Sequence, residues 1–302
     1  MALLGALPSR FRRERLLVVG CGDVGQRVLP FAARGVRVLA LTSSPARVPS
    51  LRAQGVTPLL GNLDDPTSFR RLSGLATRVL HLAPPPSANP QWRTDPRTQA
   101  LVRVWSRRTP PKSVVYGSTS GVYGDCSGAW VDETRPVAPH TPRAQRRVDA
   151  ERHVRAFGRR AGVPTAMLRI PGIYAPNREG GTPRERLLRG TPVLQAQDDV
   201  YTNHIHADDL ARACWLAVWR SQGQRCINVS DDTTLKMGDY FDLAADLYGL
   251  PRPPRVARDA AQSTLPVVLL SFMSESRRLD NRRMKTELGL RLHYPTVQDG
   301  LA

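Results

Sequence analysis

The chain has 302 residues, of which 41% are hydrophobic, and this is enough to bury one large core or two closely joined ones. No apolar run approaches the roughly 18 to 20 residues that span a bilayer. The apolar start of residues 1–15 is short and its charges follow the apolar part, so we expect neither a secretory signal nor a membrane anchor. The four cysteines are scattered without metal-type spacing, which predicts reduced thiols, a cytoplasmic protein and no bound metal.

The formal net charge is +18, and arginine supplies nearly all of the 44 basic residues. The arginines are spread along the chain, and their clusters lack the interleaved aromatic residues that stack on bases. A nucleic-acid surface is therefore the less favoured of two interpretations. The other is a composition biased towards arginine on solvated helix faces. An anionic ligand, such as a phosphorylated cofactor, is compatible with both.

Strand and helix patterns alternate through the first half of the chain. Short apolar runs predict buried parallel strands at 16–19, 36–41, 56–60, 79–82 and 113–116. The patterns between them predict helices at 24–34, 45–54, 66–72 and 96–107. Strands that alternate with helices predict βαβ units with right-handed crossovers.

A long helix is predicted at 142–161, with Thr141 as its N-cap and Pro142 at its first position. The later elements are a strand at 164–170, a second strand at 203–205 and a helix at 207–219.

Together these patterns predict an α/β fold with a Rossmann-type, doubly wound parallel sheet. The dinucleotide-binding domain is expected to comprise residues 1–175 and to be completed by about 201–229. Residues 176–200 and 230–302, which include stretches rich in Pro, Gly, Arg and Asp, are expected to form a smaller C-terminal substrate lobe.

The first predicted strand leads directly into a glycine-rich motif, Gly20-Cys-Gly22-Asp-Val-Gly25, and a helical pattern follows it. Gly20 permits the tight turn, Gly22 lets the backbone approach a pyrophosphate, and Gly25 lets the helix lie close to the sheet. With Asp23 and Val24, these glycines are the predicted contacts to the phosphates of a dinucleotide.

The end of the second predicted strand indicates which dinucleotide binds. An NAD-binding chain usually offers Asp or Glu to the adenosine ribose there. This chain offers Thr42, Ser43, Ser44 and Arg47 instead, which suit a 2′-phosphate, so NADP is preferred over NAD. The alternative is that Ser44 and Pro45 merely begin a helix and that Arg47 is solvated on it.

Further blocks follow in order: Gly61-Asn-Leu-Asp-Asp65, Gly117-Ser-Thr-Ser-Gly-Val-Tyr-Gly124 with Asp132-Glu-Thr-Arg-Pro136, Arg169-Ile-Pro-Gly-Ile-Tyr-Ala-Pro176, Asn203-His-Ile-His-Ala-Asp-Asp209, Asn228-Val-Ser230, and Glu287-Leu-Gly289 with Tyr294-Pro-Thr296. With the glycine motif, they resemble the extended and atypical short-chain dehydrogenase/reductase superfamily, which comprises NAD(P)-dependent epimerases and dehydratases. The resemblance covers nearly the whole chain.

The resemblance implies a role for several residues. Thr119 is expected to hold the reacting carbonyl or hydroxyl of a small-molecule substrate. Asn62 and Leu63 are expected to approach the adenine. The passage towards the nicotinamide is expected to be lined by Leu82, Ala83 and Pro84 and by Pro171 to Ile173. It also implies a homodimer formed through the helices near 96–107 and 142–160.

The chain departs from the family pattern where relatives carry Tyr-x-x-x-Lys, because Arg143 and Arg147 occupy those positions. An arginine is effectively always protonated, so Arg143 cannot shuttle a proton near neutral pH. Arg147 can still donate hydrogen bonds to a ribose, although both arginines can equally be solvated. A second departure places Thr202 where nucleotide-sugar enzymes commonly carry an arginine, which makes a nucleotide-sugar substrate doubtful.

A proton must then come from Tyr123, Tyr174, His204 or a water held by Thr119. His204 is slightly preferred because its ordinary pKa lies near working pH, although it can equally satisfy backbone groups at a strand end.

Two further residues have two interpretations each. Asp95 falls where many relatives carry an active-site Asn, and it also suits the cap of helix 96–107. Trp130 is expected either to cover the substrate or to lie in the core.

Three functions follow from these features. The preferred one is an NADP-dependent oxidoreductase or epimerase that acts on a small hydroxyl- or carbonyl-bearing substrate. The second is a non-catalytic, redox-sensing NADP-binding regulator, which the loss of the Tyr/Lys pair favours. A nucleic-acid binder ranks last.

Overall fold

The computed structural model describes residues 13–32, 35–87 and 92–302. The chain divides into two compact units. The first unit comprises residues up to 117, together with 149–167 and 214–225. The second unit comprises 118–148, 168–213 and 226–302. The lobe expected from the sequence therefore lies within the second unit, which also takes in segments on either side of it.

A seven-stranded sheet with the order β12-β7-β5-β4-β1-β2-β3 forms the centre of the fold. Its strands are β1 (Glu14–Val19), β2 (Val36–Thr42), β3 (Thr57–Leu60), β4 (Arg78–His81), β5 (Ser113–Thr119), β7 (Thr165–Ile170) and β12 (Gln224–Asn228). β1 pairs in parallel with both β2 and β4, and the order reverses at β1 as in doubly wound sheets. The predicted Rossmann-type α/β fold is confirmed.

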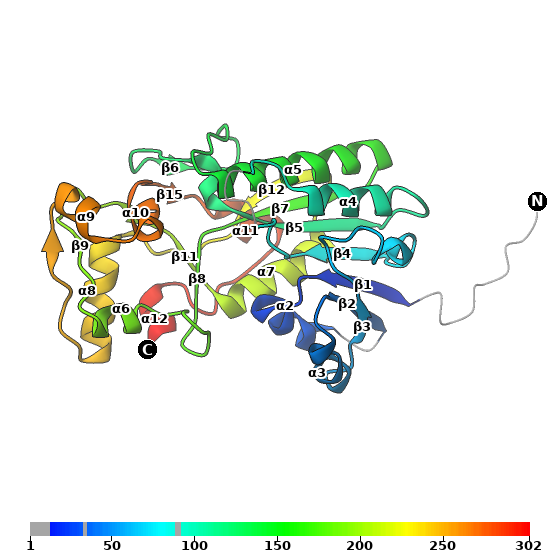
Figure 1. Ribbon diagram of the computed structural model, residues 1–302, viewed down its shortest axis with the longest axis horizontal. Coiled ribbons are helices and arrows are strands. Elements are labelled where there is room, and N and C mark those ends of the chain that lie inside the picture. Colours follow the sequence, from blue (N-terminus) through cyan, green and yellow to red (C-terminus); the bar gives the residue numbers. More distant parts are fainter. Residues whose placement is uncertain (1–12, 33–34, 88–91) are drawn as a thin grey trace, which may run out of the picture. The chain divides into compact units, whose positions relative to one another are not determined.

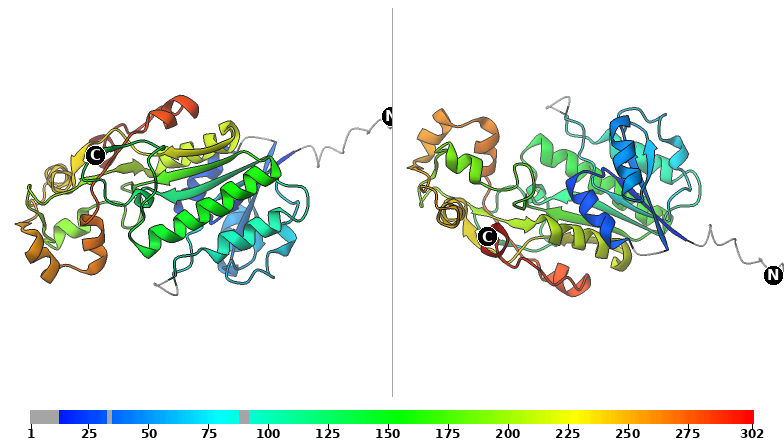
Figure 2. Two further views of the ribbon diagram at one scale, coloured as in Figure 1. Left: turned by 90° about the horizontal axis from the view of Figure 1, so that it is seen from above. Right: turned by 90° about the horizontal axis from the view of Figure 1, so that it is seen from below.

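Helices cover both faces of the sheet in the first unit (Figures 1 and 2). They are α2 (Asp23–Val28), α3 (Val48–Ala53) and α4 (Pro96–Trp105), together with parts of two longer helices. These parts are residues 149–161 of α5 (Pro142–Ala161) and residues 214–220 of α7 (Ala207–Arg220). α4 and α5 lie on one face, and α2 and α7 lie on the other. The four residues Leu16 to Val19 of β1 are at most 1% exposed, so β1 is the centre of this core.

The predicted N-cap of α5 is confirmed, because the Ala144 amide donates to the Thr141 hydroxyl at 3.2 Å. The helix predicted at 66–72 is wrong, and only a short 3₁₀ turn, η3 (Arg70–Leu72), forms there. Local bonds explain the difference. The Thr67 amide donates to the Asp65 carboxylate at 3.0 Å and the Ser68 hydroxyl to the Asp65 carbonyl at 2.7 Å, which favours turns over a helix.

The other helix predictions need smaller corrections. α2 ends at Val28 and is followed by the 3₁₀ turn η1 (Leu29–Phe31), which contains Pro30. The predicted helix 24–34 also includes residues 33–34, which lie outside the described residues. The predicted helix 45–54 is the turn η2 (Pro45–Arg47) followed by α3.

The second unit is built from short strand pairs and short helices. The strand pairs are β8 (Gly172–Tyr174) with β11 (His204–His206), β9 (Val193–Leu194) with β14 (Arg255–Val256), β10 (Tyr201–Thr202) with β13 (Leu235–Lys236), and β6 (Trp130–Val131) with β15 (Arg278–Leu279). The helices and turns wholly within it are η4 (Ser120–Tyr123), α6 (Arg184–Leu188), α8 (Met237–Tyr248), α9 (Arg258–Thr264), α10 (Val267–Met273), α11 (Arg282–Glu287) and α12 (Val297–Leu301).

The core of this unit lies around one face of α8, where Tyr240, Phe241 and Ala244 pack with Tyr174 of β8 and Leu301 of α12. Within the described part of the chain, no helix is both long and apolar enough to cross a membrane.

Candidate functional site

The glycine motif forms a tight turn between β1 and α2 in the first unit. Gly20 has a positive φ of 85°, and a Cβ added there would lie 2.4 Å from the Ala83 nitrogen. The amides of Leu82 and Ala83 both donate to the Val19 carbonyl, at 2.8 and 3.0 Å. The structure therefore brings Gly20 together with Leu82 and Ala83, as the sequence predicts for one wall of a cofactor site.

The other two glycines differ from Gly20 in what surrounds them. A Cβ added at Gly25 would lie 3.1 Å from the Gly20 carbonyl oxygen and 3.4 Å from Val18, so Gly25 allows α2 to approach the sheet. A Cβ at Gly22 would meet no non-neighbouring atom of the described chain within 4 Å. No neighbouring atom of the described chain therefore explains why position 22 is a glycine. The predicted contact Asp23 is paired with Arg27 at 3.0 Å, and Val24 is buried.

Arg47 reaches from the turn after β2 back to the glycine motif. Its guanidinium donates to the Cys21 carbonyl oxygen at 2.5 Å, so the interpretation of Arg47 as merely solvated is wrong. Ser44 does precede a helical turn, and its amide donates to the buried Thr42 hydroxyl at 3.2 Å. Ser43 is exposed beside them. The end of β2 therefore carries one arginine, which contacts the motif, and three hydroxyl residues, with no carboxylate.

The loops after β3 and β4 are joined by Arg97 of α4. Its guanidinium binds both oxygens of the Asp64 carboxylate, at 2.7 and 2.6 Å, and donates to the Pro84 carbonyl at 3.1 Å. Asn62 is exposed and its side-chain oxygen accepts the Asp64 amide at 3.0 Å, while Leu63 is half-buried. The segment expected to approach the adenine is therefore held to the segment expected to lead towards the nicotinamide.

Asp95 begins a buried polar chain through Thr98 to His81, and only its link to His81 was not predicted from the sequence. Asp95 caps α4 by accepting the Thr98 amide at 3.2 Å and the Thr98 hydroxyl at 2.6 Å, which confirms the capping interpretation. The same hydroxyl lies 2.9 Å from Nε2 of His81 at the end of β4. All three residues are at most 1% exposed, so they fix the position of the β4 end relative to α4.

In the second unit, Thr119 ends β5 and begins the turn η4. Its hydroxyl accepts the Gly121 amide at 3.3 Å. Among the described residues, nothing accepts the hydrogen of this hydroxyl, which leaves it able to donate to a substrate oxygen. A Cβ added at Gly121 would lie 3.6 Å from the Thr119 hydroxyl and 3.9 Å from the Ala144 side chain. Thr119 therefore neighbours the first turn of α5.

That first turn carries the two arginines that replace the family's Tyr and Lys. Arg143 is exposed and Arg147 is half-buried. Surrounding protein lowers the pKa of Arg143, and the charges of Arg147 and Arg146 lower it further. Arginine nevertheless keeps its proton at any physiological pH, so this turn supplies charge and no proton transfer.

Tyr123 is enclosed in the second unit. It is 1% exposed, its hydroxyl donates to the Asn228 side chain at 2.8 Å, and the Arg169 guanidinium lies 4.7 Å from its ring centroid. Burial raises the pKa of Tyr123 to about 12, although the neighbouring Arg169 opposes this. The hydroxyl proton of Tyr123 is thus already donated to Asn228, and a role for Tyr123 in proton transfer stays a prediction.

His204 lies beside the segment expected to line the nicotinamide passage. It pairs in register with Gly172, and a Cβ added to Gly172 would lie 3.6 Å from the His204 ring. The ring stacks on Tyr240 at a centroid distance of 4.2 Å, and Nδ1 is buried without a hydrogen-bond partner. The alternative that it bonds backbone groups is therefore wrong. Burial lowers the pKa of His204 to about 4, so the ring is neutral at pH 7.

Tyr174, the remaining proton-donor candidate, is 2% exposed. Its hydroxyl donates to the Thr296 carbonyl oxygen at 3.1 Å. Burial, together with the nearby Asp231 carboxyl, raises the pKa of Tyr174 well above its usual value. Like Tyr123, it is poorly placed to release a proton.

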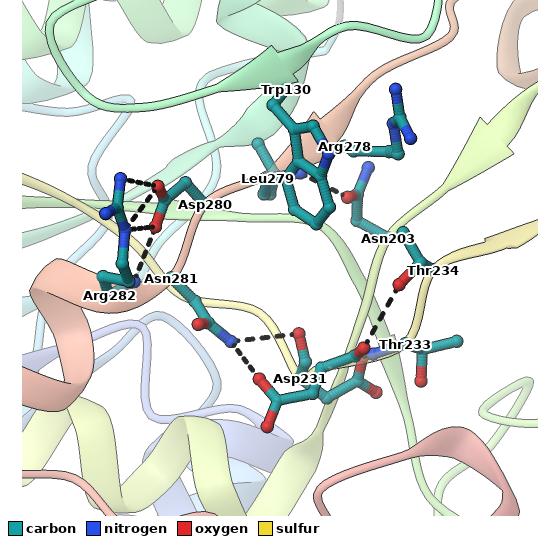
Figure 3. Close-up of a pocket in the computed structure, with 11 residues that line it drawn as sticks. Trp130, Asn203, Asp231, Thr233, Thr234, Arg278, Leu279, Asp280, Asn281 and Arg282 are labelled. Carbon is teal, nitrogen blue, oxygen red and sulfur yellow. Dashed lines mark hydrogen bonds and ion pairs between the residues drawn. The ribbon is translucent and has the colours of Figure 1, made fainter.

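A separate cavity of about 310 Å³ lies between the β6–β15 pair and the loop that follows β12 (Figure 3). Trp130 on its wall is 57% exposed, so the expectation that it lies in the core is wrong. The Arg278 guanidinium lies 5.2 Å from its ring centroid. None of the sequence-predicted catalytic or cofactor residues lines this cavity.

The sheet order and the glycine turn define a dinucleotide-binding protein of the doubly wound class. A model of the NAD dependent epimerase/dehydratase family matches residues 16–230, and the chain belongs to this family of enzymes. The resemblance expected from the sequence is confirmed.

Three relatives cover the chain almost completely. The 3-diazoavenalumate denitrifying reductase of Streptomyces sp is 26% identical over 310 residues, which cover 95% of this chain and 99% of that protein. The structure of a functionally unknown conserved protein from Silicibacter pomeroyi DSS is 32% identical, with a TM-score of 0.77 and 95% and 96% of the two chains covered. MoeE5 in complex with UDP-glucose and NAD is 23% identical, with a TM-score of 0.73 and the same coverage, and shares the fold.

Proposed function

We propose that this chain is an NADP-preferring oxidoreductase that transfers hydride between the nicotinamide and a small substrate held by Thr119. The observation that carries the proposal is the contrast among the three glycines of the motif. Protein contacts require Gly20 and Gly25, whereas open space surrounds the Cβ position of Gly22. A glycine at a position where the protein leaves room for a side chain is expected where a ligand comes close to the backbone. Gly22 is therefore the contact to the pyrophosphate.

The preference for NADP rests on the end of β2. Arg47 is already held against the glycine motif through Cys21, and Thr42 to Ser44 add hydroxyls without any carboxylate. A fixed guanidinium favours a 2′-phosphate, and a carboxylate at this place would repel one. In this proposal Arg147 donates to the nicotinamide ribose, and Asn62 and Leu63 contact the adenine.

A reduction fits the residues present better than an epimerisation. When hydride leaves a hydroxyl-bearing carbon, a base must take the hydroxyl proton, and Arg143 cannot accept one. Tyr123 and Tyr174 already donate to protein oxygens, and the neutral His204 is a weak base with a pKa of about 4. These candidate side chains therefore suit a hydride step in which the substrate itself is the strong electrophile and no base is needed.

One relative is named as a denitrifying reductase of a diazo compound, 3-diazoavenalumate, and we extend diazo compounds to this chain as a candidate substrate class. Hydride from the nicotinamide, added to the terminal nitrogen of an aryldiazonium cation, would give a neutral diazene. The diazene then loses N₂ as its carbon–nitrogen bond breaks and a carbon–hydrogen bond forms. The hydride step requires no proton donor, which agrees with an arginine at position 143. Small carbonyl compounds remain the other candidate class, with water beside Thr119 as the source of the proton.

The alternative is a non-catalytic NADP-binding regulator, which the same replacement of Tyr by Arg143 favours. The family relatives named as a reductase and as an epimerase favour the enzyme. By analogy with the superfamily we also propose a homodimer, for which light scattering should give twice the mass of one chain.

The test follows NADPH oxidation by its nicotinamide absorbance with a panel of small carbonyl and aryl diazo compounds. We expect turnover by the natural chain and a loss of roughly 100-fold in kcat for Thr119→Ala. Thr119→Ser keeps the hydroxyl and should retain activity. NADPH affinity should be the same in all three proteins. Tight NADPH binding without turnover of any compound would favour the regulator.

A further inference from the structure

We propose that the cavity beside Trp130 is a second ligand site, which binds a neutral pyranose sugar. The sugar ring stacks on the indole of Trp130, and its hydroxyl groups bond to the polar side chains around it. The site belongs entirely to the second unit and contains none of the residues predicted for the cofactor or for catalysis. The proposal therefore goes beyond the oxidoreductase function and does not depend on it.

The cavity has the size of a site for one small ring. Its volume of about 310 Å³ is at the lower end of the range of small-molecule sites, roughly 300–1,000 Å³. A dinucleotide would need a larger volume. The walls are formed by Trp130, residues 231–234 and residues 278–282, together with Asn203 (Figure 3).

Trp130 supplies an apolar face that the protein leaves uncovered. It is 57% exposed, although aromatic side chains contribute most to stability when they are buried. Figure 3 shows the indole with Asp280 and Asn281 to one side of it and Asn203 and Thr234 to the other. An aromatic ring among polar groups matches a ligand that has an apolar face and a polar edge. A pyranose is such a ligand, because its C–H groups form a face and its hydroxyl groups surround it.

Hydrogen bonds hold the wall around Trp130 in place without any ligand. Arg278 is the register partner of Trp130 in the β6–β15 pair, and it donates to the Gly128 carbonyl at 2.7 Å. Asn203 bonds the backbone on both sides of Arg278. Its side-chain nitrogen donates to the Arg277 carbonyl at 2.9 Å, and its side-chain oxygen accepts the Leu279 amide at 2.8 Å. A wall fixed in this way loses little freedom when a ligand binds.

Asn281 supplies a buried acceptor that the protein does not use. It is only 8% exposed, and Nδ2 donates to the carbonyls of Ser230 and Asp231 and to the Asp232 carboxylate, at 2.9, 3.1 and 2.8 Å. These three acceptors determine which atom of the amide is the nitrogen. Among the described residues, nothing donates to Oδ1. Because buried amide oxygens normally have a donor, a ligand hydroxyl is the expected partner.

The charges of the cavity favour a neutral ligand. Asp232 is paired with Lys285 at 2.5 Å, and Asp280 is paired with Arg282 at 2.6 Å. Burial raises the pKa of Asp231 to about 8, so this carboxyl is mostly protonated at pH 7. A cationic ligand would therefore find each carboxylate already paired, and an anion would lie near two carboxylates.

The hydrogen-bonding groups favour a sugar over a planar heteroaromatic ring. The bonds that Asp232 accepts from Asn281 and Lys285 both end on Oδ1, and within the described chain Oδ2 accepts none. Oδ2 and the Asn281 oxygen both need donors from a ligand. A pyranose presents several hydroxyl donors around its ring, whereas a nucleobase presents one or two N–H groups along one edge.

The test is a calorimetric titration with the methyl pyranosides of glucose, galactose and mannose, supported by NMR saturation transfer to the sugar protons. For a ligand of this size we expect a Kd of about 1 mM for at least one of the three. The titrations are made with and without NADPH, and the sugar affinity should be equal in both. A failure of NADPH to bind would overturn the proposed function and leave this test unaffected.

Trp130→Ala should weaken sugar binding at least tenfold, and Trp130→Phe should retain part of it. Trp92→Ala is the matched control, because Trp92 is also exposed, at 44%, and belongs to the first unit. It removes an exposed indole away from the cavity and should bind the sugar like the natural chain. Thermal unfolding should show that all three variants are folded.

Four results would overturn the inference. The first is that none of the three glycosides binds with a Kd below about 10 mM. The second is an equal loss of binding in Trp130→Ala and Trp92→Ala. The third is loss of sugar binding when NADPH is added, which would place the sugar in the cofactor site. The fourth is tighter binding of uridine or benzamide than of any glycoside, lost in Trp130→Ala, which would assign the cavity to planar rings.

Discussion

The guanidinium of Arg47 donates a hydrogen bond of 2.5 Å to the carbonyl oxygen of Cys21, inside the motif formed by Gly20 to Gly25. The two residues are 26 positions apart, and they join the turn after β2 to the turn after β1. Both turns stand at the carboxyl ends of adjacent parallel strands, where ligands of doubly wound sheets bind. The bond therefore fixes a positive charge at the expected adenosine end of a dinucleotide site.

Removing this charge should change the choice of cofactor. Arg47→Gln is expected to weaken NADPH binding by about ten- to a hundredfold, because a hydrogen bond to a charged group contributes about 1.5–3 kcal/mol. NADH binding should change less than threefold. The measurement is calorimetric titration with both cofactors. Arg52→Gln, on the exposed side of α3, is the control and should leave both affinities unchanged. Equal losses for both cofactors would contradict the assignment of Arg47 to the 2′-phosphate.

The glycine motif offers a matched pair of substitutions. Gly22→Ala adds a methyl group to open space at a φ of −79°, which any residue adopts, so the free energy of unfolding should stay within about 0.5 kcal/mol. NADPH affinity should nevertheless fall at least tenfold, because the methyl group occupies the expected place of the pyrophosphate. Calorimetry and thermal unfolding measure the two effects.

Gly20→Ala should instead lower the stability of the fold. Its φ of 85° is unfavourable for alanine, and the new Cβ would lie 2.4 Å from the Ala83 nitrogen. We expect a loss of stability of at least ~1–2 kcal/mol from the backbone alone, seen as a lower melting temperature. Unchanged NADPH affinity in a well-folded Gly22→Ala protein would remove the main support for the cofactor site.

The loss of folding stability at low pH should come in part from His204. Burial lowers the pKa of its folded-state ring to about 4, whereas an unfolded chain titrates near 6.5. Between these values the unfolded chain binds more protons, so stability falls as the pH drops from about 6.5 to 4. His204→Phe keeps the stack on Tyr240 and should flatten this part of the curve, measured by melting temperature against pH. The same substitution at the exposed His140 should leave the acid sensitivity in place.

Asp231 should give the opposite dependence of folding stability on pH. It is 3% exposed, and burial raises its pKa to about 8. The folded chain therefore binds more protons between about pH 4 and 8, and stability falls as the pH rises through that window. Asp231→Asn still accepts the Thr233 amide but no longer titrates. Its melting temperature should exceed that of the natural chain by ~2–4 °C or more above pH 8, and the difference should shrink towards pH 4. A constant difference at every pH would contradict the buried titration.

The sequence predicted those parts of the fold that local patterns determine. The strand Glu14–Val19 and the glycine turn follow from an apolar run and three glycines within ten residues, and the α5 cap follows from Thr141 and Pro142. The helix expected at 66–72 failed because the side chains of the turn compete for backbone groups. Periodicity does not register that competition.

Contacts between distant residues could not be predicted in the same way. His81 and Thr98 are joined across 17 residues, and His204 stacks on Tyr240 across 36. Such pairs depend on how the elements pack, which leaves no local signal in the chain. The same reason explains why Tyr123 was a plausible proton donor in sequence, whereas in the structure its hydroxyl is committed to Asn228.

The central claim is that a phosphorylated nicotinamide coenzyme binds at the turn between β1 and α2. Titration calorimetry of the natural chain with NADPH and with NADH tests it most directly, with thermal unfolding in parallel. The account predicts that NADPH binds at least tenfold more tightly than NADH and raises the melting temperature. No heat and no thermal protection from either coenzyme, on well-folded protein, would contradict it.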